Sequence, residues 1–148
     1  IGPTAYTWGY LAAEDGVDDE IATVQGNADS NILTATGQNE VIDGTQPLDV
    51  TPGQGEIDVL IAGNGRDTIV LGDIGRVFYD DGDAALPGLD DYALIKGFDL
   101  TQGDRIQLHG TANDYALGAA PGGVPSGTAI FNQSEGTPEL CSGRRYGS

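Results

Sequence analysis

A nine-residue repeat between residues 26 and 79 restricts the possible folds of this chain more than any other feature. Its most complete copy, residues 62–70, reads AGNGRDTIV: a small residue, then Gly-x-Gly-x-Asp, then an aliphatic residue two positions after the Asp. Steps of nine from Ile69 define a column that is apolar at five of six positions: Leu33, Ile42, Thr51, Leu60, Ile69 and Phe78. A fixed short period predicts stacked units that share one core.

Three further columns keep the same period. The column two residues before the core position is acidic at four of six positions: Asn31, Glu40, Asp49, Asp58, Asp67 and Arg76. The first position of each copy is small at five of six: Gly26, Ala35, Gly44, Gly53, Ala62 and Leu71. The residue before the core position is always β-branched: Ile32, Val41, Val50, Val59, Thr68 and Val77. Because β-branched residues favour strands and glycine permits tight turns, the pattern predicts short strands rather than helices.

This pattern resembles the nonapeptide repeat of the RTX, or haemolysin-type calcium-binding, family, Gly-Gly-x-Gly-x-Asp-x-aliphatic-x, with Ala62 in place of the first glycine. The resemblance implies a parallel β-roll in which two nonapeptides make one coil and Ca²⁺ ions lie in rows between the turns. Residues 91–99, DYALIKGFD, and 103–108, GDRIQL, are similar to the segment that closes the β-roll in RTX proteins and serralysin-type proteases. There Gly97 replaces an Asp, and Asp99 is the expected substitute.

The resemblance also implies which residues bind calcium, a cation that prefers hard carboxylate and carbonyl oxygens. The expected side-chain ligands are Asp58 and Asp67. Backbone carbonyl ligands are expected from Gly53, Gly55, Gly63, Asn64 and Gly65, and the second-rank ligands are Asp73, Asp81 and Asp83. Rows 26–52 have lost most of their glycines, so we expect them to form structural coils with few or no metal sites.

The charge of the chain is consistent with this interpretation. The 148 residues contain 23 acids against 6 lysines and arginines, giving a formal net charge of −17. Such a charge disfavours nucleic acid and anionic membrane surfaces as partners. It suits a chain that stays loosely folded until cations neutralise it, although acidity for solubility alone is the simpler alternative. The recurrence of acids in register beside glycines favours calcium.

The residue inventory disfavours catalysis. His109 is the only histidine, so the two-histidine zinc motif of metalloproteases is not present. No Gly-x-Ser-x-Gly pattern occurs. The single cysteine, Cys141, allows no intrachain disulfide, and no stretch is apolar enough to span a membrane. We therefore expect a non-enzymatic protein, and the absence of methionine suggests a processed product or a fragment.

The chain divides into four segments. Residues 1–24 form a capping segment, in which the aromatic stretch 5–11 is either a capping strand or a self-assembly patch and 14–20 is an acidic turn. Residues 25–79 form the nonapeptide β-roll. Residues 80–110 hold an acidic loop and two closing strands joined by the turn 100–103. Residues 111–148 form a loop-like Gly- and Pro-rich segment with one strand at 128–131 and a basic tail from Cys141, which is either disordered or docks onto an acidic surface of a neighbouring subunit.

The predicted fold is therefore all-β, a short irregular parallel β-roll or β-solenoid with capping strands. The predicted function is a calcium-binding structural module, secreted or on the cell surface, that Ca²⁺ folds and stabilises. One alternative is a self-assembling filament or surface-layer subunit with calcium between the copies. The other is a non-catalytic C-terminal part of a larger secreted hydrolase.

Overall fold

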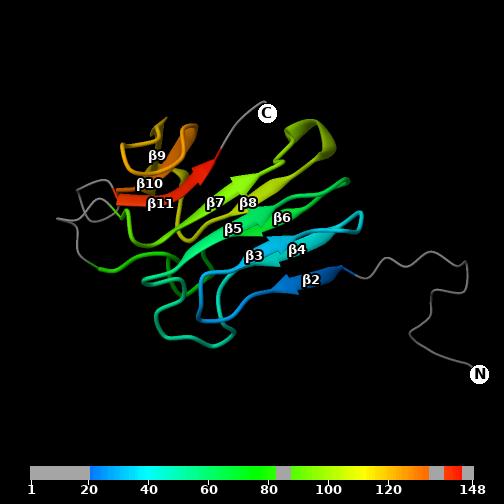
Figure 1. Cartoon of the computed structure of the whole chain (residues 1–148), viewed down its shortest axis with the longest axis horizontal. Coiled ribbons are helices and arrows are strands. Elements are labelled where there is room, and N and C mark those ends of the chain that lie inside the picture. The colour runs from blue at the N-terminus through cyan, green and yellow to red at the C-terminus, as the bar shows by residue number, and fades with distance from the viewer. Residues whose placement is uncertain (1–20, 83–87, 134–138, 145–148) are drawn as a thin grey trace, which may run out of the picture.

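The protein is all-β, and its strands are short (Figure 1). The computed structural model describes residues 21–82, 88–133 and 139–144. The strands are β2 (Ala22–Gln25), β3 (Ile32–Thr34), β4 (Glu40–Asp43), β5 (Ile57–Ile61), β6 (Thr68–Val70), β7 (Tyr92–Lys96), β8 (Arg105–Gln107), β9 (Tyr115–Ala119), β10 (Thr128–Asn132) and β11 (Glu139–Arg144). Two single-turn 3-10 helices, η2 (Leu100–Gln102) and η3 (Ala112–Asp114), precede β8 and β9.

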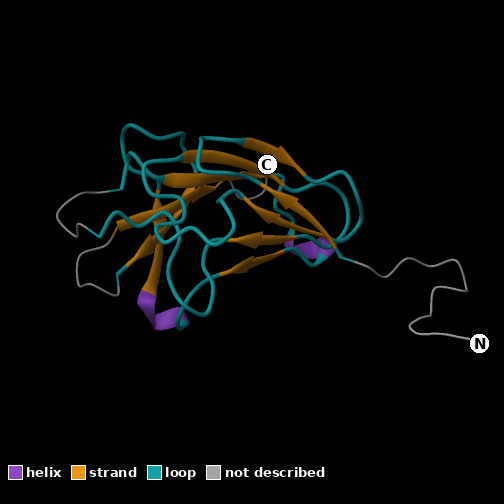
Figure 2. Cartoon of the chain, turned by 90° about the horizontal axis from the view of Figure 1, so that it is seen from below, coloured by secondary structure: helices purple, strands orange, loops and turns teal. Residues whose placement is uncertain are grey.

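Successive strands from β2 to β8 alternate between two sheets. The four-stranded sheet has the order β2-β4-β6-β8, and the six-stranded sheet has the order β3-β5-β7-β11-β10-β9. Every pairing among β2 to β8 is parallel. Figure 2 shows the strands in two layers. The crossover that parallel neighbours require is supplied here by a strand of the opposite sheet and its two turns.

A column of aliphatic residues from each sheet forms the core. In the four-stranded sheet the aligned residues are Val24, Ile42, Ile69 and Ile106. In the six-stranded sheet they are Leu33, Leu60 and Ile95. The completely buried members belong to one cluster: Ile42, Ile69, Leu60 and Ile95. The partly buried members pack against that cluster: Val24, Ile106 and Leu33. The predicted core positions Leu33, Ile42, Leu60 and Ile69 thus lie in strands and contribute to the core.

The strand register keeps multiples of nine through the repeat. Ala22 in β2 pairs with Glu40 in β4, 18 positions later. Ile32 in β3 pairs with Val59 in β5, 27 positions later. The longer step arises because residues 44–56 form a loop instead of a strand. Two members of the predicted core column, Thr51 and Phe78, consequently lie outside the strands, although Phe78 is buried.

Prolines and an arginine explain why the loop of residues 44–56 does not join a sheet. Pro47 and Pro52 lie in it, and proline lacks the N–H that a central strand must donate. The guanidinium of Arg76 donates to the carbonyl oxygens of Asp49 and Val50 from outside the loop. These contacts occupy carbonyl groups that a neighbouring strand would otherwise bind.

The segment after β8 differs from the sequence-based prediction. The closing strands β7 and β8 and the turn between them occur where predicted, as does β10. However, β9 lies in a stretch predicted to be loop, and β11 occupies residues 139–144, where a disordered tail was expected from Cys141 onward. β11 pairs in parallel with β7 and antiparallel with β10, so its strand structure depends on neighbours that are distant in sequence.

Several predictions fall outside the described residues: the aromatic stretch 5–11, the acidic turn 14–20, Asp83 and the last four residues of the basic tail. No helix within the described ranges is long and apolar enough to cross a membrane.

Candidate metal centre

The turns that lead into the strands form two rows, one for each sheet. The β4-β6-β8 turn row comprises residues 35–40, 62–67 and 97–104. The β3-β5-β7 turn row comprises residues 26–31, 44–58 and 71–91, so it includes the first two residues of β5; residues 83–87 lie outside the description. Because consecutive strands start in different rows, the predicted ligands Asp58 and Asp67 belong to different rows and do not meet.

Aspartates in the β4-β6-β8 turn row accept hydrogen bonds from the backbone, including the backbone of the neighbouring turn. Asp67 Oδ1 accepts a hydrogen bond from the N–H of Glu40 at 2.9 Å, and its Oδ2 accepts one from the N–H of Gly63 at 3.1 Å. Asp104 repeats the arrangement in the next turn of the row, accepting the N–H groups of Asp67 and Asp99, each at 2.8 Å. Both carboxylates are buried, and every oxygen has an N–H donor. The row therefore satisfies its own buried charge with backbone groups.

Asp58 makes the equivalent bond in the β3-β5-β7 turn row. Its Oδ1 accepts the N–H of Asn31 at 2.6 Å, and its Oδ2 accepts the hydroxyl of Tyr79 at 2.5 Å. Gly44 packs against both groups, and a Cβ there would lie 2.5 Å from the tyrosine oxygen, so only glycine fits. We call the hydrogen bonds from buried aspartates to the backbone of the neighbouring turn the backbone ladder. In the β3-β5-β7 turn row this ladder has one rung, because Ala93 occupies the position in β7 that Asp58 occupies in β5.

Burial affects the protonation of these ladder carboxylates. It raises the pKa of both Asp58 and Asp67, while the hydrogen bonds they accept act in the opposite direction. Burial and the negative charge of Asp58 together raise the pKa of Tyr79 well above its usual value, so the tyrosine hydroxyl keeps its proton and remains the donor. The predicted calcium ligands therefore already have a structural role that requires no metal.

The predicted carbonyl ligands lie in turns whose backbone the structure defines. Gly53, Gly55 and Gly65 have positive φ angles of 80°, 74° and 98°, which favour glycine. A Cβ on Gly65 would overlap the carbonyl oxygen of Gln38, so this turn packs directly onto the preceding turn of the row. A Cβ on Gly63 would lie 2.5 Å from the carbonyl oxygen of Ala35, so Gly63 also lies close to that preceding turn.

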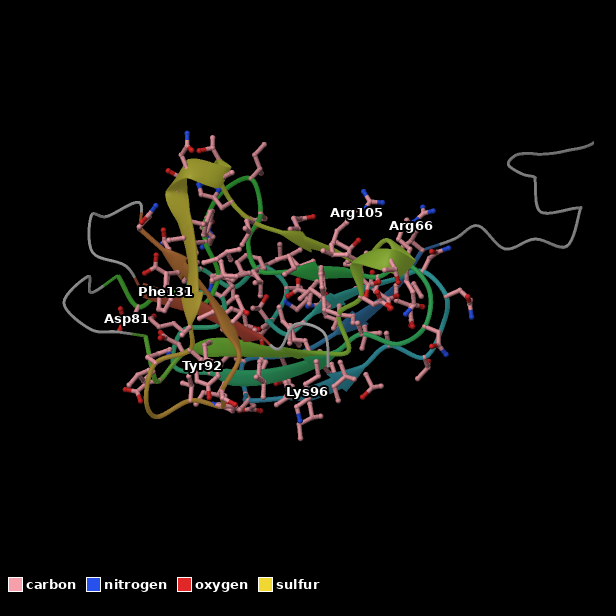
Figure 3. All side chains as sticks on the ribbon, turned by 90° about the horizontal axis from the view of Figure 1, so that it is seen from above. Arg66, Asp81, Tyr92, Lys96, Arg105 and Phe131 are labelled. Carbon is pink, nitrogen blue, oxygen red and sulfur yellow. The ribbon has the colours of Figure 1, made fainter. Side chains whose placement is uncertain are left out.

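The remaining predicted ligands are dispersed. Asn64 is exposed in the turn before β6. The carboxylate of Asp73 accepts the N–H groups of Gly75 and Arg76 at 2.7 and 2.9 Å, which shapes a local turn. Asp81 lies near Asp91, at the opposite end of the protein from Arg66 and Arg105 (Figure 3).

Two acids that sequence reasoning did not select have the least satisfied carboxylates of the described residues. Glu56 is 4% exposed and Asp91 is 2% exposed. Glu56 Oε1 and Asp91 Oδ1 are buried without a hydrogen-bond partner. They precede β5 and β7 respectively, and the N–H of Tyr92 donates to the carbonyl oxygen of Glu56 at 3.1 Å, so their backbones are adjacent. A buried carboxylate oxygen without a partner is costly and calls for a cation or a proton.

Neighbouring acids intensify that requirement. Burial, followed by the charges of Asp58 and Asp49, raises the pKa of Glu56 to about 7. Burial, followed by the charge of Asp81, raises the pKa of Asp91 to about 6. Backbone N–H groups of Gly53 and Gly55 act in the opposite direction on Glu56 and Asp91 respectively.

One sequence signal could have identified Glu56. Residues 53–58 read GQGEID, with one residue more than the repeat allows between the second glycine and the aspartate. That additional residue gives the row an acid immediately before β5 as well as Asp58 within it. No comparable irregularity marks Asp91, whose burial depends on the pairing of β5 with β7.

The donors at this end of the protein fit a hard cation. They are carboxylate oxygens, which Ca²⁺ prefers. No group of three His, Cys, Asp or Glu side chains is arranged as a metal site within residues 21–82, 88–133 and 139–144. A cation beside Glu56 or Asp91 would therefore need backbone carbonyl oxygens and water in addition to carboxylates, a mixture that is common for Ca²⁺.

Comparison of the sequence with models of known protein families gives no match, and neither does comparison with curated proteins. The functional proposal therefore rests on the geometry of the turn rows.

Proposed function

We propose that this protein is a calcium-stabilised structural module of an exported or cell-surface protein, built as a short parallel β-roll. The alternation of β2 to β8 between two parallel sheets supports the roll, since each pair of strands then makes one coil. Register steps of 18 and 27 residues, both multiples of the nonapeptide, support it further. The antiparallel strands β9 to β11 continue one sheet beyond β7 and would serve as the cap of that sheet.

The observation that carries the calcium proposal is the pair of buried carboxylates with unpartnered oxygens, Glu56 and Asp91. A protein of net charge −17 has few internal cations to neutralise them. Asp58, Asp67 and Asp104 already accept backbone hydrogen bonds in the ladder. A bound cation would therefore stabilise the protein most beside Glu56 and Asp91 in the β3-β5-β7 turn row.

A bound Ca²⁺ would supply positive charge and fill its coordination sphere with hard oxygen ligands. In the proposed site Asp91 and Asp81 hold the cation before β7, and Glu56 holds a second one before β5. At neutral pH and low calcium these acids repel one another, and Glu56 Oε1 and Asp91 Oδ1 have no hydrogen-bond partner, which destabilises the β5-β7 pairing. Calcium removes both effects, so binding and folding become coupled.

A calcium titration of the chelator-treated protein tests this proposal. Circular dichroism and thermal unfolding should show a gain of β structure and a higher Tm with millimolar Ca²⁺, but not with Mg²⁺. The double variant Glu56→Gln, Asp91→Asn should lose most of that response. Asp90→Asn is the matched control, because Asp90 is an exposed acid beside Asp91 and should leave the response nearly intact.

A protein already fully folded in chelator whose Tm does not move with Ca²⁺ would count against calcium binding. A response that survives in the double variant would count against this site and would transfer the cation to another group of acids.

A second candidate function, self-assembly, is favoured by the outer strands of the repeat. Among the described strands, β3 forms one edge of the six-stranded sheet and β2 one edge of the four-stranded sheet, and unpaired strand edges promote association. Ile32 on β3 is 74% exposed. Sedimentation with and without calcium would distinguish the two functions, because an assembling protein forms larger species as its concentration rises whereas a stabilising module stays monomeric.

A further inference from the structure

The part of the interrupting loop before Gly53 forms a surface that the proposed calcium chemistry does not use. Residues 44–56 lie beside the short hairpin closed by the pairing of Gly72 with Val77. Between the loop and the hairpin is a cavity of about 310 Å³, which we term the Leu48 cavity. Its apolar lining comes from Pro47, Leu48, Val50, Pro52 and Phe78.

Leu48 is held in a conformation that residues other than glycine rarely adopt. It follows Pro47 in a turn closed by a 3.2 Å hydrogen bond from the N–H of Asp49 to the carbonyl oxygen of Gln46. Its φ angle is 66°, at the turn position where glycine is usual. The side chain is 100% exposed, so no internal packing offsets the strain. A strained residue that contacts only solvent does not stabilise the fold, so contact with a partner is the better explanation for it.

Other exposed aliphatic residues continue the rim of the Leu48 cavity. Val50 also lines the cavity and is 77% exposed. Ile74 is 100% exposed and follows Asp73, a lining residue on the hairpin. A local concentration of exposed apolar side chains around a concavity is typical of a contact surface.

The charges of the cavity select the chemistry of a partner. The carboxyl-bearing lining residues are Asp43, Asp49 and Asp73, against one arginine, Arg76. Arg76 uses its guanidinium to hold the loop, donating to the carbonyl oxygens of Asp49 at 3.3 Å and of Val50. The lining is therefore apolar with a net negative charge, which is complementary to a cationic apolar ligand.

We propose that the Leu48 cavity binds an extended peptide segment of another protein in which a basic residue adjoins a large apolar one. The apolar side chain packs against Leu48, Val50 and Phe78. The basic side chain lies against the carboxylates of Asp49 and Asp73. The anchoring of the loop by Arg76 keeps this surface formed before the partner arrives, which lowers the entropic cost of binding.

The proposal is tested by amide chemical-shift mapping of the isotope-labelled, calcium-loaded protein, to which three hexapeptides are added in turn. One alternates lysine and leucine, one alternates glutamate and leucine, and one alternates lysine and serine. The lysine–leucine peptide should shift the amides of Leu48, Val50, Asp73 and Phe78 and bind at least tenfold more tightly than the other two. Equal binding of the lysine–serine peptide would reduce the effect to attraction by net charge and would overturn the proposal.

Leu48→Gly separates binding from folding. Glycine adopts the positive φ angle without strain, so Tm should stay the same or rise while peptide affinity falls at least tenfold. Leu100→Ala is the matched control, because Leu100 is 68% exposed and lies in the other turn row; it should leave affinity unchanged. Unchanged affinity in Leu48→Gly would exclude the cavity as the binding site.

The chain also contains a basic and aromatic segment of its own, GRRYGS at residues 143–148, which serves as a fourth peptide. Tight binding of that peptide at the same amides, together with concentration-dependent sedimentation of the whole chain, would identify the occupant as a second copy and would replace the proposed foreign partner.

Discussion

Both turn rows contain buried acidic residues, but these residues have different roles in the two rows. In the β4-β6-β8 turn row, each buried aspartate accepts two backbone N–H groups, one of them from the equivalent residue of the adjacent turn. In the β3-β5-β7 turn row, Asp58 accepts one such bond. Two further acids in this row, Glu56 and Asp91, each have one buried oxygen without a hydrogen-bond partner, Oε1 and Oδ1 respectively. A carboxylate that is aligned with the N–H group of the equivalent residue in the neighbouring turn is thus satisfied by the backbone, and a carboxylate outside that alignment needs a ligand.

This difference shows how a repeat can contain both scaffold and site. Where the step between Asp67 and Asp104 keeps the carboxylate in register with an N–H group, burial of charge is structural. Where Ala93 replaces the aspartate and Glu56 is added, the row has surplus negative charge. An acid in a calcium-like motif is therefore not by itself a metal ligand, and its hydrogen-bond partners have to be counted first.

The largest expected effect comes from adding a methyl group to each row. Gly65→Ala in the β4-β6-β8 turn row should destabilise the protein by more than about 3 kcal/mol, because the new Cβ overlaps the carbonyl oxygen of Gln38 and φ is 98°. Gly55→Ala should cost only about 1–2 kcal/mol, since φ is 74° but no atom lies within 4 Å of the Cβ. Urea unfolding measures both, and equal costs would contradict the close stacking of the first row.

Replacing one aspartate of each row by asparagine should change stability in opposite directions. Asp67→Asn places an amide NH₂ against an N–H donor and should destabilise the protein by about 2 kcal/mol. Asp91→Asn removes a buried charge and should stabilise the calcium-free protein at pH 8 by about 1–2 kcal/mol. Denaturant unfolding in chelator tests the pair, and a loss of stability in both variants would remove the proposed contrast between the rows.

The calcium-free protein should become less stable as pH rises from about 4 to about 7. Glu56 and Asp91 have pKa values raised to about 7 and about 6, so the folded state holds protons that the unfolded state releases at lower pH. Stability from the neutral forms is complete below the unfolded pKa values and is lost through this window, by on the order of 2 kcal/mol. Chemical unfolding at several pH values checks this, with Glu56→Gln, Asp91→Asn as the variant in which the slope should flatten. Stability that rises steadily from pH 5 to pH 8 in chelator would contradict it.

A smaller effect is expected at the single rung of the β3-β5-β7 turn row. Tyr79→Phe removes the hydroxyl that donates to Asp58 Oδ2 and should cost about 1–2 kcal/mol. Tyr115→Phe, which removes a hydrogen bond to the carbonyl oxygen of His109, is the comparison variant and should cost about 0.5–1 kcal/mol because that tyrosine is only partly buried. Thermal unfolding of the two variants ranks them, and the reverse ranking would contradict a special role for the rung.

The fold was predictable from sequence where its period is intact. The columns of Leu33, Ile42, Leu60 and Ile69 occur in strands because alternation within a short β-branched stretch is a local signal. The strand β9 was missed because alanine and glycine supply three of its five residues, which have weak strand propensity. β11 was missed because its strand structure depends on the edge that β7 presents, which no local pattern encodes.

The candidate site was harder to predict for a related reason. The motif identifies carboxylates but not their donors, and one donor of Asp58 and one donor of Asp67 come from residues 27 positions earlier in the chain. Glu56 and Asp91 attract attention only once β5 is paired with β7, because burial is what makes an unpartnered oxygen costly.

The pairing of β11 with β7 also has a kinetic consequence. Ser142 is aligned with Ala93, so this parallel contact closes across 49 positions, whereas β2 and β4 join across 18. Contacts between distant segments form slowly, because loop closure must precede any gain from pairing. The strands of the repeat can therefore pair through more local contacts first, while the side of β7 that later pairs with β11 remains unpaired. During that interval the six-stranded sheet is most vulnerable to pairing with another molecule, and the speed with which β11 arrives limits the yield of folded protein.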